Sequence, residues 1–248
     1  MSQLQKVIER VQRGEGPRIG FGTLTREKPR AMALGALCQD GDSAKAAIEA
    51  GADFVVFRAQ DTRGAVEAIK ATGEVKAPLG AWLSEVRADD ADALAEAGAD
   101  FVASPLEGTG AEAVDTERLG HILAVTNDLE EGLLRSLGPL GLDGMFVKRP
   151  DGEMTLQQQV EMTRLSALSG MSLLVSTPAD ISTGALRVLR DSGTVAVVAA
   201  EGAAPDDIKG LNERLRSIPV RRSRGRQGET PFIPSVRQEE EHEHDHED

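Results

Sequence analysis

The charged residues that follow short apolar runs are the candidates for chemistry in this sequence. The clearest is Lys148, which ends the run GMFVK within the stretch GLDGMFVKRPDGE, residues 141–153. An amine at the end of a buried strand could hold an anion or exchange protons, and a solvated lysine in a polar turn is the alternative. Glu107 and Glu201 follow other apolar runs and could donate or accept protons. We therefore predict that Lys148, Glu107 and Glu201 are catalytic.

A second group of residues occupies the same kind of position and is predicted to bind substrate. Each lies at or just after the end of an apolar run, where a parallel sheet collects its functional side chains. Arg58 could hold an anionic group, and Trp82 could either wall the site or pack in the core. The predicted substrate-binding residues are Arg58, Asp61, Trp82, Ser104, Asn127, Ser176, Thr177 and Gly202.

Eight short apolar runs must position these side chains. They are too short for buried helices and lack polar alternation, which is typical of strands buried on both faces of a parallel sheet. Amphipathic segments separate them, the weakest at residues 107–120, and an amphipathic helix at residues 2–11 precedes them. This order predicts an α/β fold, a (β/α)8 TIM barrel, with an open doubly wound sheet as the competitor. The expected strands are residues 32–38, 54–59, 78–84, 101–106, 121–127, 144–149, 172–178 and 195–200.

An internal repeat supports closure of the barrel. AGADFVVFR at residues 50–58 is similar to AGADFVASP at 97–105, and more loosely to GLDGMFVK at 141–148 and DSGTVAVV at 191–198. The copies fall on alternate strands, and alternate strands share interior layers in such barrels. The junctions AGADFVVF and AGADFVAS resemble those of the ribulose-phosphate-binding and class I aldolase groups of TIM barrels.

That resemblance implies the fold and a position for chemistry. Arg58 and Lys148 each lie five residues after the aspartate that precedes their strand, so both are expected to point the same way. In the resembled barrels this place on an even-numbered strand usually faces the interior. Lys148 there resembles the Schiff-base lysine of class I aldolases. Such a lysine needs partial desolvation and a neighbouring cation, for which Arg58 and Arg149 are candidates.

The loops after the last two expected strands differ from the phosphate sites of the resembled barrels. Those sites use glycine-rich loops and a helix N-terminus, whereas this chain has STPADISTG and AAEGAAPDD. Ser176, Thr177 and Gly202 could still help to hold a phosphate. The carboxylates of Asp180 and Glu201 suit a cation or an amine substrate equally well.

No cofactor is expected, and no metal site inside the barrel. His121 is the only histidine outside the tail, and it begins an expected strand, so we predict a structural role. Cys38 is predicted to be a small buried side chain, because no histidine is placed to activate it. Four carboxylates could supply oxygen ligands to Mg²⁺, although their spacing does not require it: Asp40, Asp61, Glu85 and Glu107.

Composition restricts the partners and the location. The 248 residues carry a formal net charge of −13, which argues against nucleic acid and anionic membranes as partners. A single cysteine excludes an internal disulfide and fits a reducing compartment, and no signal peptide or membrane span is visible. We expect a cytoplasmic protein with a small-molecule substrate, whose exposed barrel faces could support a homo-oligomer.

The chain is expected to divide at residue 219. Residues 1–219 would form the barrel, and residues 220–248 a disordered tail that is first basic and then acidic. His242, His244 and His246 alternate with acids and could bind a divalent metal weakly. A solubilising acidic tail is the simpler interpretation.

Two functions remain open on these grounds. The first is an enzyme, a lyase of the aldolase type or an isomerase, acting on a polar carbonyl metabolite with or without phosphate, with Lys148 as its central residue. The second is a non-catalytic barrel that binds partners through its surface or its acidic, histidine-containing tail. Polar residues at strand ends favour the first, whereas the scarcity of histidine and the absence of glycine-rich phosphate loops favour the second.

Overall fold

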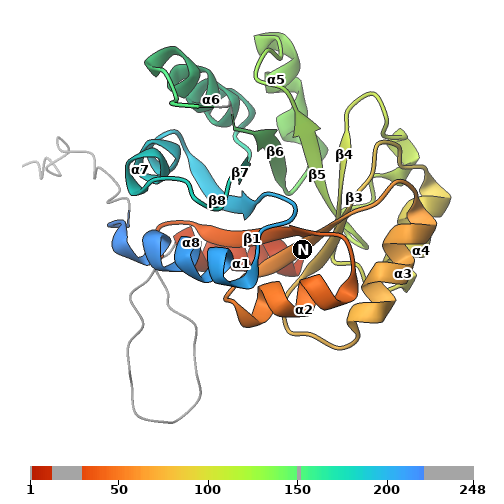
Figure 1. Ribbon diagram of the computed structural model, residues 1–248. Helices are drawn as coiled ribbons and strands as arrows, with labels where there is room; N and C mark the ends of the chain where they lie inside the picture. The colour runs from red at the N-terminus through yellow and green to blue at the C-terminus, as the bar shows by residue number, and fades with distance from the viewer. Residues whose placement is uncertain (1, 13–29, 150–151, 221–248) are drawn as a thin grey trace, which may run out of the picture.

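Eight strands formed by the apolar runs close into a parallel barrel in the computed structural model, which describes residues 2–12, 30–149 and 152–220 (Figure 1). Each strand pairs with the next along the chain, and β8 pairs with β1. The predicted (β/α)8 barrel is therefore confirmed and the open sheet is excluded. The strands are β1 Ala33–Cys38, β2 Phe54–Arg58, β3 Leu79–Trp82, β4 Phe101–Pro105, β5 Gly120–Val125, β6 Gly144–Lys148, β7 Leu173–Thr177 and β8 Thr194–Ala199.

Helices cover the outside of the barrel, and several of them begin at a capping side chain. Asp40, Asp61, Thr155 and Ser182 each accept a hydrogen bond from the backbone N–H three residues later. The α-helices are α1 Gln3–Gln12, α2 Gly41–Glu49, α3 Thr62–Thr72, α4 Ala88–Glu96, α5 Glu131–Leu137, α6 Leu156–Ser169, α7 Thr183–Asp191 and α8 Pro205–Ser217, and the short 3₁₀ helices are η1 Ala111–Ala113 and η2 Gly138–Leu140.

The connection between β4 and β5 departs from the strand-helix pattern, because it contains only η1 where a longer helix was expected. Its backbone bonds to the preceding connection instead. The Val86 N–H donates to the Gly108 carbonyl at 2.9 Å, and the Gly110 N–H donates to the Val86 carbonyl at 2.9 Å. A Cβ at Gly108 would collide with the Ser84 backbone. Glycine therefore lets two connections pair at the point where the sequence pattern indicates a helix.

The buried residues form two layers. Alternate strand residues point into the barrel and pack with one face of α1, and the remaining buried residues lie between the sheet and the outer helices. The inner layer comprises Ala33, Phe54, Val56, Phe101, Ala103, Ile122, Phe146, Leu174, Ala196 and Val198, with Leu4, Ile8 and Val11 from α1. The amphipathic helix expected at the start of the chain thus closes the N-terminal end of the barrel.

Aspartates of the internal repeat hold α1 in this place. The carboxylate of Asp100 accepts the N–H groups of Gln3 and Leu4 at 2.7 and 2.8 Å, which caps the first turn of the helix. The hydroxyl of Ser2 donates to Asp143 at 2.6 Å. The aspartates that precede β4 and β6 therefore hold α1 in place at the N-terminal end of the barrel.

In the described part of the chain, no helix combines the length and the apolarity that a membrane crossing needs. Residues 221–248, which make up nearly all of the expected tail and include its three histidines, lie outside the described residues.

Candidate functional site

Arg58 and Lys148 extend from the C-terminal ends of opposite strands, since β2 and β6 lie four places apart in the ring of eight. Two residues earlier, Val56 and Phe146 belong to the inner layer, so both charged side chains share the inward direction of their strand. Both residues are exposed. The two cations that the sequence singled out thus stand on opposite sides of the barrel mouth.

An aromatic pair forms the floor beneath them. The rings of Trp82 and Phe146 meet edge to face, with centroids 5.0 Å apart, and Trp82 packs against the inner layer. Trp82 is only half-buried and lies in register with Arg58 on the neighbouring strand. It therefore serves both as a core residue and as a wall of the mouth, the two alternatives that the sequence left open.

Glu201 joins Arg58 at the rim of the mouth. Its carboxylate lies 3.7 Å from an Arg58 guanidinium nitrogen, and it accepts a hydrogen bond of 2.6 Å from the Gln39 side-chain amide. These residues follow β8, end β2 and follow β1, so the cluster spans three adjacent strands. Because the pair is largely exposed, its contribution to stability is small. Gln39 was not predicted from the sequence, although its place directly after a strand was the available signal.

Ser176 and Gly202 complete the part of the predicted set that gathers at the mouth. Ser176 lies in register with Lys148 and shares the inward direction of Leu174. Gly202 follows Glu201 with a φ of 82°, a left-handed conformation that a glycine adopts without strain and that turns the chain away from β8.

Ser104 and Thr177 lie on the other side of the sheet. Their neighbours Ala103 and Leu174 show that the inward positions on β4 and β7 are one or three residues away. Ser104 is fully buried, and its hydroxyl contacts His121 Nε2 at 3.0 Å and the Thr109 hydroxyl at 2.7 Å. Thr177 is buried as well, and its hydroxyl has no hydrogen-bond partner among the described residues. Neither side chain belongs to the mouth.

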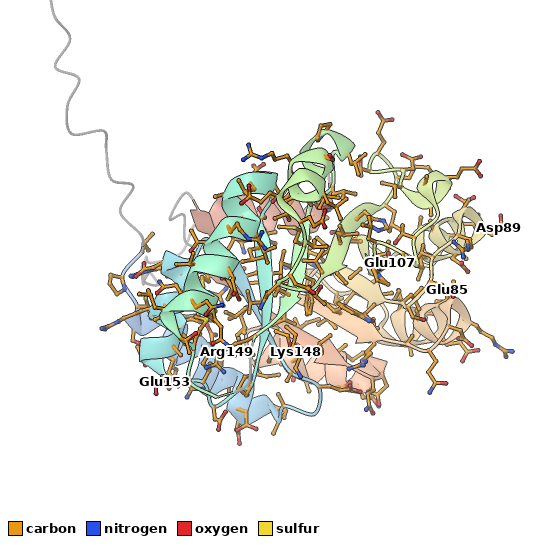
Figure 2. All side chains as sticks on the ribbon, turned by 90° about the horizontal axis from the view of Figure 1, so that it is seen from above. Glu85, Asp89, Glu107, Lys148, Arg149 and Glu153 are labelled. Carbon is orange, nitrogen blue, oxygen red and sulfur yellow. The ribbon has the colours of Figure 1, made fainter. Side chains whose placement is uncertain are left out.

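The other predicted residues make contacts outside the mouth or lie away from Lys148. Asp61 accepts the N–H of Gly64 at 2.8 Å and so caps α3. The backbone carbonyl of Asn127 accepts from Arg164, and its side-chain oxygen is buried without a partner in the described part of the chain. Figure 2 shows Glu107 toward the side of Glu85, apart from Lys148. The structure thus does not bring this predicted proton carrier to the lysine.

His121 and Cys38 both have the structural environments that the sequence indicated. Burial lowers the pKa of His121 to about 4. Burial also raises the pKa of the Cys38 thiol to about 11, and Cys38 packs in the layer between sheet and helices. Within residues 2–12, 30–149 and 152–220, no three histidine, cysteine or acidic side chains gather as metal ligands would, so the four carboxylates considered for Mg²⁺ do not meet.

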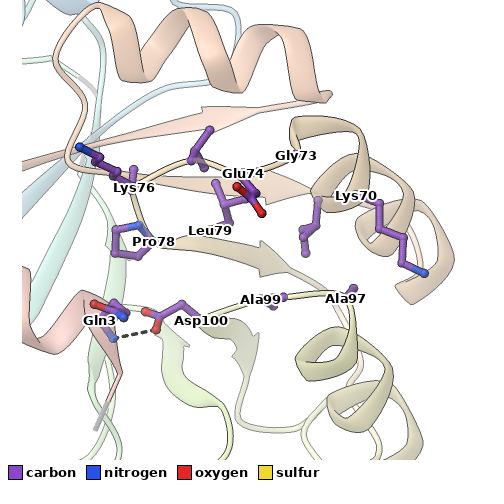
Figure 3. Close-up of a pocket in the computed structure, with 14 residues that line it drawn as sticks. Gln3, Lys70, Gly73, Glu74, Lys76, Pro78, Leu79, Ala97, Ala99 and Asp100 are labelled. Atoms are coloured by element: carbon purple, nitrogen blue, oxygen red, sulfur yellow. Dashed lines mark hydrogen bonds between the residues drawn. The ribbon is translucent and has the colours of Figure 1, made fainter.

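A cavity of about 970 Å³ lies at the opposite end of the barrel, between the C-terminal ends of α3 and α4 (Figure 3). Asp100 lines it, but this carboxylate is already engaged with α1. Lys70 and Glu74 on its rim are exposed. Since active sites of this fold lie at the C-terminal ends of the strands, the cavity belongs to the structural end of the barrel.

Comparison with known proteins agrees with this architecture. No protein-family model matches the chain, and no curated protein matches it significantly. Among solved structures, the open form of tryptophan synthase from Mycobacterium tuberculosis with bound BRD0059 superposes with a TM-score of 0.63 at 13% identity, over 88% of this chain and 98% of that one. The alpha subunit of tryptophan synthase from Pyrococcus furiosus, in a mutant form, superposes with a TM-score of 0.59 at 12% identity, over 76% and 99%. At such identities the likeness establishes one thing: the chain has the fold of these (β/α)8 barrels.

Proposed function

We propose that the protein is an enzyme that acts on a small carbonyl metabolite at the C-terminal mouth of its barrel, as a lyase of the aldolase type or as an isomerase. The observation that carries the proposal is the pair of inward-directed cations, Arg58 and Lys148, on opposite sides of an aromatic floor. In a chain of net charge −13, two cations facing one mouth form a local site for a metabolite that carries a carboxylate or a phosphate.

Each residue of the mouth has a role in this proposal. Arg58 holds the anionic group of the metabolite by charge-assisted hydrogen bonds. The amine of Lys148 adds to the carbonyl carbon and water leaves, which gives an iminium. In the lyase reaction the next carbon–carbon bond breaks, its electrons form an enamine with the iminium carbon, and Glu201, already beside Arg58, takes the hydroxyl proton of the departing fragment, which leaves as an aldehyde. Ser176 orients that hydroxyl, and protonation of the enamine by Glu201 followed by hydrolysis of the imine restores the amine. Because Lys148 is exposed, the bound metabolite itself must exclude water from the amine.

Borohydride trapping tests the lysine directly. The protein is treated with borohydride in the presence of small aldehydes, ketones and 2-oxo acids, and its intact mass is measured. We expect a reduced adduct with wild type that is lost in Lys148→Ala, because the proposal assigns the imine to this amine. Lys209→Ala, which removes an exposed lysine of α8, is the matched control and keeps the adduct.

A second variant tests the anion site. Arg58→Ala is expected to raise the 2-oxo acid concentration needed for half-maximal trapping by roughly ten- to a hundredfold. This factor corresponds to the free energy that a charge-assisted hydrogen bond contributes to binding. Trapping of a neutral aldehyde should change little. Absence of an adduct with every carbonyl would rule out imine chemistry for this panel and would favour an isomerase without an imine or the non-catalytic barrel.

A further inference from the structure

The place where (β/α)8 barrels usually hold a phosphate is acidic in this protein. That place is formed by the connections after the last two strands together with a helix N-terminus. Residues 178–186 and 200–208 contain both connections and the first turns of α7 and α8, and they include no lysine or arginine. Their four carboxylates are exposed to any ligand that approaches from solvent: Asp180, Glu201, Asp206 and Asp207.

The N-terminus of α8 offers few hydrogen-bond donors to an anion. Its first residue is Pro205, which has no N–H group. The N–H of Ala204 donates to the Asp207 carboxylate at 3.2 Å, and the N–H of Ala203 donates to the Ala200 carbonyl at 3.3 Å. The helix therefore begins with an acid of its own chain at the end where an anionic ligand would bind.

Cations that approach these connections are engaged with other groups. Arg214 of α8 donates to a backbone carbonyl in the connection after β7, and Lys209 contacts Asp206 at 3.1 Å. The guanidinium of Arg149 donates to a backbone carbonyl three residues further on. A phosphate ester carries about two negative charges near neutral pH, so it would meet uncompensated carboxylates at this place.

Arg58 differs from these cations because its donors are available. Its guanidinium forms no hydrogen bond to another described residue, and its contact with Glu201, at 3.7 Å, is longer than a hydrogen bond. The planar guanidinium matches a carboxylate with two parallel hydrogen bonds. This one fixed positive charge balances one negative charge, since the amine of Lys148 must be uncharged when it attacks a carbonyl.

The width of the barrel limits the length of the ligand. Arg58 and Lys148 extend inward from opposite strands, and the interior of an eight-stranded barrel is just wide enough for its side chains. The rings of Trp82 and Phe146 close the space below them. A ligand held by both cations therefore has its anionic group and its carbonyl close together. In a 2-oxo acid these two groups are on adjacent carbons.

We propose that the metabolite of the barrel mouth is a short 2-oxo acid without phosphate, and that Asp180 and Asp207 select against phosphate esters. This inference rests on the proposed function, because it names the substrate class of the same site. In the lyase reaction the substrate is a 4-hydroxy-2-oxo acid. Its bond between the third and fourth carbons breaks, the enamine fragment becomes the 2-oxo acid, and the remainder leaves as the aldehyde.

Borohydride trapping with three ketones tests the substrate class. The full chain is titrated with pyruvate, dihydroxyacetone and dihydroxyacetone phosphate, and α-acetyl-lysine is titrated in parallel to correct for the reactivity of each carbonyl. After this correction, pyruvate is expected to reach half-maximal trapping at about a tenth of the concentration of the other two or less. Half-maximal trapping by the phosphate ester at a lower concentration than pyruvate would overturn the proposal and leave the imine chemistry intact.

The double variant Asp180→Asn/Asp207→Asn tests the selecting residues. An amide oxygen can still accept the Ala204 N–H, so the cap of α8 is kept while two charges are removed. The concentration for half-maximal trapping of the phosphate ester should fall by about tenfold, and that of pyruvate by about threefold or less, because the effect grows with ligand charge. Asp191→Asn, at the far end of α7, is the matched control and should change neither. An equal change for all three ketones would contradict the selection.

Binding of lactate tests the carboxylate site without any imine, because lactate has the carboxylate but no carbonyl. Dissociation constants of lactate and inorganic phosphate are measured by NMR titration. Lactate should bind more tightly than phosphate, and Arg58→Ala should weaken lactate binding by about tenfold or more. Tighter binding of phosphate, or lactate binding that is insensitive to Arg58→Ala, would overturn the proposal. Lactate binding at Arg58 without an adduct from any ketone would instead overturn the imine chemistry and support the carboxylate site.

Discussion

At the scale of the residue, burial determines what His121 can do. Its ring is 1% exposed, and the Ser104 hydroxyl that contacts Nε2 also contacts Thr109, which donates to the Pro105 carbonyl at 2.6 Å. This chain of hydrogen bonds joins β5 to the connection after β4. A serine hydroxyl 3.0 Å from a histidine nitrogen is an arrangement that nucleophilic active sites also use. This pair faces away from the mouth, however, and contributes to the structure instead.

His121 should make the protein less stable as the pH falls. Its pKa of about 4 in the folded state lies below its ordinary value of 6.5, so between these values the unfolded chain binds a proton that the folded chain does not. The contribution of neutral His121 to the free energy of unfolding is therefore fully present above about pH 6.5. It is lost as the pH falls toward 4, by on the order of 3 kcal/mol in total.

Urea unfolding of wild type and His121→Gln at a series of pH values measures this effect. The glutamine variant should show a flatter pH dependence in that window, whatever its stability at neutral pH. Asp143, whose pKa is raised by burial, titrates in both proteins and cancels in the comparison. Parallel curves for the two proteins would contradict the assignment.

The alternation of side chains along each strand determines which of the predicted residues belong to the mouth. Counting five residues from Asp53 and Asp143 indicated the inward direction of Arg58 and Lys148. The same count from Asp100 reaches Pro105, which puts Ser104 on the outward side. The two-residue period of the strand therefore predicts that Ser104 points away from the mouth. The cluster of Gln39, Glu201 and Arg58 depends on loop conformations, which no periodicity encodes.

At the scale of the element, α1 shows how a short helix is stabilised by groups far away in sequence. It has ten residues, and an isolated helix of that length is only marginally stable in water. Packing of Leu4, Ile8 and Val11 on the inner layer supplies the apolar contact, and Asp100 supplies the cap. The sequence predicted the helix from its periodicity, but the cap comes from a residue 97 positions away and could not be seen locally.

Asp100→Ala is expected to destabilise the protein by about 1–2 kcal/mol, the cost of losing a helix cap. The N–H groups of Gln3 and Leu4 then lose their acceptor. The free energy of unfolding in urea is the measurement. Glu117→Ala removes an equal charge from an exposed position before β5 and should change stability by less than about 0.5 kcal/mol. Equal effects of the two variants would show that charge, not capping, is responsible.

At the scale of the whole molecule, small residues on one strand make room for aromatic rings on the next. Phe54 and Phe101 meet edge to face with centroids 6.1 Å apart. A Cβ added to Gly35 would lie 2.4 Å from the Phe54 ring, and one added to Gly80 would lie 2.3 Å from the Phe101 ring. Glycines on odd-numbered strands and phenylalanines on even-numbered strands therefore fill this part of the interior together, which fits the repeat on even strands that the sequence revealed.

Gly80→Ala should cost about 1–3 kcal/mol through overpacking against Phe101. Gly132→Ala, in α5 with nothing within 4 Å of the added carbon, should instead stabilise the protein by about 0.5–1 kcal/mol. Thermal or urea unfolding measures both. In a double-mutant cycle, Phe101→Leu should relieve part of the cost of Gly80→Ala, and strict additivity would mean that the ring is not the obstacle.

The anchoring of α1 also imposes an order on assembly. The helix precedes every strand in the chain, yet the two acidic groups that fix its start lie 97 and 141 residues beyond the residues they bind. Until the segment before β6 has been made, α1 lacks the second of these partners, so it cannot be fully anchored while β1 to β5 are being synthesised. The N-terminal end of the barrel is accordingly held by contacts of long sequence separation rather than by local ones.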